Sequence, residues 1–166
     1  TDDFVNAMSD ATGVDLTQFK RWYVQAGTPQ VSVSTAFDPD SQELSIQLRQ
    51  ECSATPGQPD KAPFHIPVAL GLLDDNGKSA LIPGTPGQPT ADKNGTIILE
   101  LRETSQVFNI PGLKSAPTVS ALRDFSAPVK LMGRRPISEL TFLFGHDTDA
   151  FNRWDAGQSL FLDTLL

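Results

Sequence analysis

One stretch, LGLLDDNGKSA at residues 70–80, carries the Gly-Lys-Ser that ends a phosphate-binding loop. The full pattern is G-x-x-x-x-G-K-[ST], in which backbone N–H groups surround the phosphates of a nucleotide. It requires glycine at position 72, but Leu72 stands there and Gly71 is one residue early. A Pro/Gly-rich loop follows instead of a helix, so no helix N-terminus would face a phosphate. We therefore predict a tight turn between strands, centred on the Asn-Gly pair.

Metal or nucleophile chemistry would fall to two histidines and one cysteine. His65 and His146 are far apart, and neither an H-E-x-x-H motif nor a cysteine pair accompanies them. Cys52 paired with a distant histidine would be a nucleophile, but a small thiol is more often an inert part of a core. We expect His65 to point outward from a strand, and we expect structural or solvated roles for both histidines and for Cys52.

The remaining charged residues indicate no catalytic site. Asp147 and Asp149, in HDTD, precede a helical pattern, where aspartate is favoured because it interacts well with a helix N-terminus. Arg134 and Arg135, in GRRP, are too few for a nucleic-acid patch. The apolar run TFLFG is more typical of a core than of a sugar or peptide platform. The sequence predicts no catalytic, cofactor-binding or metal-binding residue in this chain.

Composition limits the partners. The chain has 166 residues, of which 39% are hydrophobic and 20% charged, which is typical of one globular domain. The net charge of −7 disfavours nucleic acid and anionic membrane as partners. No apolar run approaches the roughly 20 residues that span a bilayer. A single cysteine permits no internal disulfide and no signal peptide is visible, so we predict a cytoplasmic location.

The first 26 residues have the apolar spacing of two short helices separated by a glycine. Asp15 is a plausible N-cap for the second helix, which we expect to end near Gly27. One stripe of this helix carries Trp22 and Tyr23. Two short amphipathic helices have little core of their own, so we expect them to pack on something else.

After Pro29 the apolar period changes from 3.6 to 2, which predicts about seven short strands and a β-sandwich. Pro67 lies inside the third predicted strand, which should have an edge or a bulge there. The period becomes helical again near Asp147, and the chain stops at Leu166 without a helix stop signal, as expected of a segment cut from a longer protein. The seven predicted strands lie in VSVST, LSIQL, FHIPVALGLLD, TIILELRE, SQVFNI, APVKLM and ELTFLFG.

The segment FKRWYVQAGTP contains the pattern W-x-x-Q-x-G-x-P, formed by Trp22, Gln25, Gly27 and Pro29. It resembles the end of the catalytic domain in zinc aminopeptidases, enzymes with H-E-x-x-H zinc sites. Three further phrases, PFHIPVALGLLD, FSAPVKL and FNRWDAGQSL, resemble the bacterial aminopeptidase N branch of this thermolysin-like family. The four phrases occur in the family's order, and the resemblance covers essentially the whole chain.

The resemblance implies an immunoglobulin-like β-sandwich that lies between a catalytic domain and a large helical domain. It assigns residues 1–28 to the end of the catalytic domain, 29–146 to the sandwich, and 147–166 to the first helix of the helical domain. It places the zinc ligands and catalytic residues upstream, so it implies zinc in the parent enzyme and no cofactor here. The implied partners are the two flanking domains of the same polypeptide, with peptide substrate bound only through the parent.

Two functions from different classes remain open. In the first, the chain is a non-catalytic spacer of an aminopeptidase, and Trp22 and Tyr23 pack at a domain junction. In the second, it is an autonomous β-sandwich module that binds peptide or carbohydrate through its long Pro/Gly loops, since sandwiches have many functions.

Overall fold

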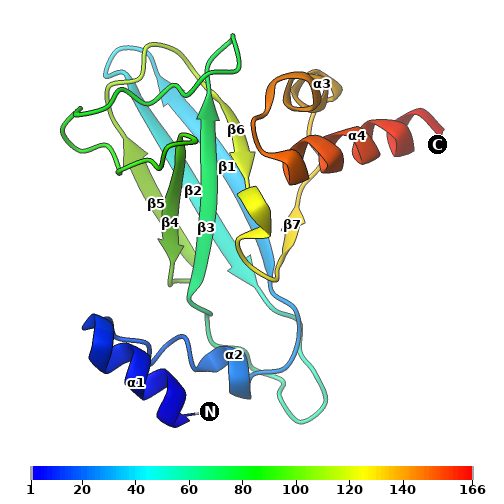
Figure 1. Cartoon of the computed structure of the whole chain (residues 1–166). Helices are drawn as coiled ribbons and strands as arrows, with labels where there is room; N and C mark the ends of the chain where they lie inside the picture. Colours follow the sequence, from blue (N-terminus) through cyan, green and yellow to red (C-terminus); the bar gives the residue numbers. More distant parts are fainter. Residues whose placement is uncertain (1, 166) are drawn as a thin grey trace.

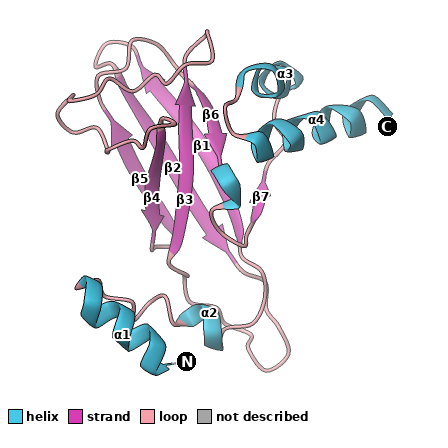
Figure 2. Ribbon diagram, viewed as in Figure 1, coloured by secondary structure: helices cyan, strands magenta, loops and turns pink. Residues whose placement is uncertain are grey.

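The structure, a computed structural model, describes residues 2–165 as a β-sandwich with helices at both ends (Figures 1 and 2). α1 and α2 lie beyond one end of the sandwich, and α3 and α4 lie beside it. The elements are α1 (Asp2–Thr12), α2 (Arg21–Val24), β1 (Gln30–Asp38), β2 (Glu43–Glu51), β3 (Ile66–Leu73), β4 (Thr96–Leu101), β5 (Ser105–Ile110), β6 (Thr118–Ala121), the 3₁₀ turn η1 (Arg123–Phe125), β7 (Lys130–Met132), α3 (Ile137–His146) and α4 (Ala150–Leu165).

The seven strands form two sheets, which confirms the predicted β-sandwich. One sheet has the order β5-β2-β1-β7 and the other has the order β4-β3-β6. β1 and β2 pair along their whole length as an antiparallel hairpin. β7 runs parallel to β1 but pairs only with residues 30–32, so most of β1 has one neighbour instead of two.

The core lies between the sheets and is built from every second residue of the central strands. Leu44, Ile46 and Leu48 of β2 are buried, whereas the alternate residues Gln47 and Arg49 are exposed. This alternation is the consequence of side chains pointing to opposite faces of a strand. β3 is buried almost throughout because β4 and β6 flank it and loops and helices cover its outer face.

The predicted edge at Pro67 is confirmed. β6 pairs with β3 only at residues 70–73, so Pro67 has a strand neighbour on one side alone. On the open side, the Ser126 hydroxyl donates to Pro67 O at 3.1 Å and accepts from Ala69 N at 3.0 Å. One side chain thus replaces the missing strand beside a residue that has no N–H to offer.

One strand assignment from the sequence was wrong, and one strand was missed. ELTFLFG, predicted as the seventh strand, forms α3, in which Leu140 and Leu143 are spaced for a helix and pack with Ala156 of α4. A short apolar run does not distinguish a buried helix from a strand, and the partner helix decides the outcome here. β6 was missed because its four residues, TVSA, are too short to show alternation. Of APVKLM, only Lys130–Met132 forms a strand.

The N-terminal helices are two, as predicted, but the second is shorter. α1 ends at Gly13, which has φ +70° and donates from N to Ser9 O at 2.8 Å. α2 has four residues and begins after Lys20, so the predicted N-cap at Asp15 was wrong. Asp15 instead accepts from Thr17 N at 2.9 Å, and this local turn ends before the helix starts.

No helix within residues 2–165 combines the length and the apolar character needed to cross a membrane. The predicted missing stop signal at Leu166 lies outside the described residues.

Candidate functional site

The sequence motif W-x-x-Q-x-G forms an N-terminal junction, which we define as residues 22–27 together with the loop at 52–65 that they contact. The Trp22 ring lies 4.6 Å from the buried Phe64 ring, and Trp22 Nε1 donates to His65 O at 2.9 Å. Buried Gln50 holds Phe64 in turn, because its side-chain amide accepts from Phe64 N at 2.7 Å and donates to Phe64 O at 2.8 Å. The tryptophan is therefore anchored to the sandwich by packing and by a hydrogen bond.

Two glutamine side chains, one on each side of the N-terminal junction, form hydrogen bonds with the backbone on the opposite side. Gln25 donates to Ala62 O and accepts from Ala62 N, both at 2.9 Å. In return Gln58 donates to Val24 O at 2.8 Å and accepts from Ala26 N at 2.7 Å. A side-chain amide has the same donor and acceptor as a peptide group, so each glutamine pairs with backbone as a short strand would. The linker after α2 is thus fixed without being part of a sheet.

Gly27 completes the N-terminal junction by allowing a close approach. Its φ is +103°, and an added Cβ would lie 2.9 Å from Cys52 Sγ. Cys52 is partly buried against this turn. The predicted packing of Trp22 is present, whereas Tyr23 contacts Phe19 edge-on and stays 55% exposed.

His65 lies beneath the N-terminal segment rather than in solvent. Phe19 packs edge-on against its ring, and Nε2 lies 3.5 Å from Glu100 Oε2. Nδ1 is buried and has no hydrogen-bond partner among residues 2–165. Burial lowers the pKa of His65 below its ordinary value, the nearby Arg102 guanidinium lowers it further, and the Glu100 carboxylate partly opposes both. The native state therefore favours the neutral imidazole.

We expect the free energy of unfolding to fall as the pH is lowered from 7.5 to 5.5. The unfolded chain takes up a proton on His65 near its ordinary value of 6.5, before the native chain does, so stability present above that pH is lost below it. Urea unfolding at several pH values measures the effect. His65→Gln should remove most of the fall, and His146→Gln should retain it. An unchanged fall in His65→Gln would assign it to other groups.

A second junction, the C-terminal junction, joins the sandwich to α3 and α4 through the buried side chain of Arg123. Its Nη2 donates to Asp147 Oδ1 at 2.7 Å, and the two side chains are 3% and 0% exposed. Nε donates to Ser120 Oγ at 3.1 Å, and Nη1 donates to Thr96 Oγ1 at 3.1 Å. The guanidinium thus contacts β4, β6 and the turn between the helices.

Asn152 and Asp149 close the C-terminal junction from α4. Asn152 Nδ2 donates to Ser120 Oγ at 2.7 Å and to Ala121 O at 3.0 Å. Asp149 Oδ1 accepts from Asn152 N at 2.8 Å, which confirms its predicted place at a helix start. Asp149 Oδ2 accepts from Asp124 N at 2.9 Å, so this cap also binds the sandwich.

Gly71 leaves space for the side chain of Arg123. It is the glycine that lies one residue too early to complete the phosphate-binding pattern. A Cβ at Gly71 would overlap the Arg123 guanidinium. On the other side, Leu122, Asp124 and Phe125 have φ near +50°, a strained region for residues with side chains. This turn directs Arg123 inward. No sequence signal marked Arg123, because a lone arginine in a loop is ordinarily solvated.

No three His, Cys, Asp or Glu side chains come together as a metal site within residues 2–165. His65 lies at the N-terminal junction, and His146 ends α3, where its ring packs near Phe142. The resemblance places its zinc in the parent enzyme, and the described residues of this chain offer no set of ligands for it.

Comparison with known proteins gives two matches to family profiles. Residues 27–134 match the family described as "Domain of unknown function (DUF3458) Ig-like fold". Residues 137–166 match "Domain of unknown function (DUF3458_C) ARM repeats". The predicted immunoglobulin-like character of the sandwich is therefore confirmed.

Individual relatives agree with the family matches. Aminopeptidase N of Escherichia coli is 41% identical over 159 residues, which is 96% of this chain and 18% of that protein. Aminopeptidase N of Haemophilus influenzae is 37% identical over 164 residues, with 99% and 18% covered. Among solved structures, Legionella pneumophila aminopeptidase A in complex with aspartic acid matches with a TM-score of 0.77 and 25% identity, covering 96% of this chain and 16% of that one. The chain therefore spans less than a fifth of these relatives.

Proposed function

We infer the function from the family to which this chain belongs, the DUF3458 Ig-like domain of aminopeptidase N homologues. We propose that the chain is a non-catalytic spacer that fixes the angle between a catalytic domain before it and a helical domain after it. The parent would be a zinc enzyme that removes N-terminal residues from peptides. This chain would contribute no group to that reaction.

The observation that supports the proposal is that polar and packed contacts concentrate at the two junctions. Gln25 and Gln58 fix the linker at one end, and the Arg123–Asp147 pair fixes the helices at the other. A binding module needs no such rigid ends, whereas a spacer does. Aromatic side chains remain exposed near both ends of the chain, among them Tyr23 and Trp154, as expected where neighbouring domains pack.

The test is made in the full-length parent, with Gln25→Ala. The change leaves both backbone groups of Ala62 without their partners, so the linker after α2 should loosen. We expect peptide hydrolysis to fall by at least about threefold, since small misplacements of domains slow catalysis. The bound zinc should stay constant, and labels on the two flanking domains should show a broader distance distribution.

The matched control is Gln47→Ala, an exposed glutamine on β2 whose hydrogen bonds stay on the sheet surface. It should leave activity and distances unchanged. Broader distances with full activity in Gln25→Ala would contradict a spacer function.

We also propose a cytoplasmic location for the parent, and the support within this chain is that its one cysteine has no partner for an internal disulfide. Cell fractionation with an antibody against this chain tests it, and recovery outside the cytoplasm would contradict it.

A further inference from the structure

β1 has an open edge, which we define as the side of residues 33–37 that faces away from β2. β2 pairs with β1 along all nine residues, but β7 stops at Met132, opposite Ser32. The chain then turns away at Gly133, which has φ +108°. Within residues 2–165, no strand pairs with β1 beyond Ser32 on this side.

The backbone groups at the open edge follow from alternation along the strand. Pro29 O accepts from Lys130 N at 2.9 Å, so the polar groups of Pro29 face β7. Every second residue has the same orientation, which places the N–H and C=O of Val33, Thr35 and Phe37 on the open side. In the parallel register that ends at Ser32 and Met132, the Val33 N–H faces Met132 O. The Val33 C=O and both polar groups of Thr35 and Phe37, five groups in all, remain as a template for one more strand.

The open edge lacks the features that ordinarily prevent strand addition. Natural edge strands are blunted by charged residues, proline or bulges. Residues 33–37 read VSTAF, with no charge, no proline and no glycine, and their register with β2 has no bulge. An unprotected edge of this kind is typical of a surface that accepts an extended chain.

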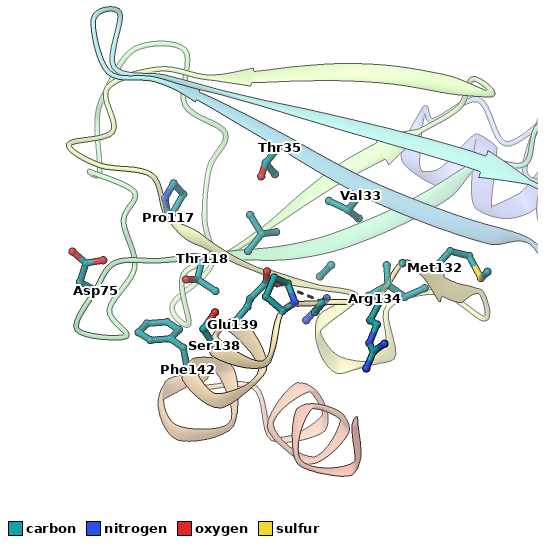
Figure 3. A pocket seen from close by; sticks show the side chains of 16 residues that line it. Val33, Thr35, Asp75, Pro117, Thr118, Met132, Arg134, Ser138, Glu139 and Phe142 are labelled. Carbon is teal, nitrogen blue, oxygen red and sulfur yellow. Dashed lines mark ion pairs between the residues drawn. The ribbon is translucent and has the colours of Figure 1, made fainter. Parts of the chain in front are cut away.

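A groove of about 570 Å³ runs along the open edge (Figure 3). Val33 and Thr35 form one wall, Thr118 and Val119 of β6 form part of another, and Phe142 of α3 contributes from the helical side. This volume lies within the range of peptide and small-ligand sites. Five extended residues span about 14 Å, which matches the open edge in length.

Charges differ between the two ends of the groove. Arg134 lies at the end near Val33, and Asp75 lies at the other end, beyond Thr35 and near Pro117. Arg135, the next residue in the chain, also lines the groove. Arg134 pairs with Asp163 at 3.0 Å while remaining 82% exposed, and Arg135 lies 3.7 Å from Glu139. Asp75 forms no ion pair with any residue in the described part of the chain.

We propose that this groove binds a short extended peptide, which adds as a strand to the open edge of β1. The peptide runs antiparallel to β1, with its carboxylate by Arg134 and Arg135 and its amino group by Asp75. Its middle residues are uncharged and β-branched, because the walls offer apolar and hydroxyl groups. The proposal does not rest on the spacer function, and it is tested on the 166-residue chain without the parent's activity.

The probe is the pentapeptide Thr-Val-Thr-Val-Thr with free termini, titrated into isotope-labelled chain and followed by amide NMR shifts. We expect a dissociation constant in the millimolar range or tighter. Slowed hydrogen exchange should be confined to the amides of Thr35 and Phe37, and shifts should be confined to residues 33–37 and the groove walls. The peptide with an amidated C-terminus should bind about threefold more weakly, because it lacks the carboxylate that the arginines attract. Equal affinity would overturn the antiparallel orientation.

Thr35→Pro is the decisive variant. It removes an N–H that faces the open edge and no bond to β2, so the fold tolerates it as edge strands do. We expect at least about tenfold weaker binding, since the hydrogen bond and the close approach of the peptide are both lost. Thr35→Val keeps the N–H and should bind within about twofold of the natural chain.

A second experiment changes the peptide and leaves the protein unaltered, so it has no effect on folding. N-methylation of the peptide at the residues whose N–H faces β1 should abolish binding, and methylation at the alternate residues should not. The absence of shifts at millimolar peptide, shifts outside the groove, or full binding by folded Thr35→Pro would each overturn the proposal. Protection of the same amides that rises with chain concentration, without peptide, would assign the edge to a second copy and overturn it as well.

Discussion

Asp147→Ala is expected to lower the free energy of unfolding of the chain by about 3–5 kcal/mol. The change removes the carboxylate from a pair in which both side chains are almost fully buried. Arg123 keeps its charge, because a guanidinium does not lose its proton, and water does not reach it to compensate. Urea unfolding of the variant and of the natural chain, monitored by circular dichroism, measures the difference.

Asp163→Ala is the matched control, since it breaks another Arg–Asp pair in the same part of the molecule. Arg134, its partner, is largely in solvent, so we expect a change within about 0.5 kcal/mol. A loss from Asp147→Ala no larger than this would show that Arg123 finds another partner or becomes solvated. The C-terminal junction would then be a weak contact rather than a fixed one.

Gly71→Ala is expected to cost about 3 kcal/mol, although it adds a single methyl group. The new Cβ occupies the space of the Arg123 guanidinium, and the guanidinium has no free direction because β4, β6 and the turn before α4 all bind it. Either the arginine leaves its partners or β3 moves away from them. Both outcomes disrupt a buried hydrogen-bond network.

Two comparisons identify the cause of that loss. On an Arg123→Ala background, the added methyl group should cost less than about 1 kcal/mol, because the clash is gone. Gly157→Ala in α4 places a Cβ 2.9 Å from the half-exposed Phe144 ring, which turns aside, and alanine favours the helix by about 1 kcal/mol. It should be neutral or mildly stabilising. An equal cost of Gly71→Ala with and without Arg123 would contradict the steric explanation.

The sequence predicted the strands of the sandwich wherever one face of a strand is buried and the other is exposed to solvent, because apolar and polar residues then alternate. VSVST and LSIQL alternate for this reason, and both became full strands of the hairpin. ELTFLFG was assigned wrongly because its burial comes from α4, whose Ala156 lies more than ten residues beyond Leu143, and a local pattern does not reveal such a partner. β6 was invisible since four residues cannot display a period.

The two junctions differed in how far the sequence revealed them. Trp22, Gln25 and Gly27 formed a recognisable motif, so the N-terminal junction was expected there. The loop that these residues contact contains Gln58 and Ala62, which lie more than 30 residues further along the chain. Only the folded chain brings this loop to the motif. Arg123 was missed for a different reason: its burial depends on a glycine, an aspartate and an asparagine that meet only after β3, β6 and α4 have packed.

The parallel pairing of β1 with β7 has a mechanical consequence. β1 begins where the chain arrives from α2, and β7 ends where the chain leaves for α3, so the two attachment points lie at opposite ends of the same three-residue ladder. A force that pulls the flanking segments apart would act along the two strands. It would load all the hydrogen bonds between β1 and β7 at once, in shear, instead of breaking them one after another. The shortest strand of the sandwich would then carry the tension between the two ends of the chain.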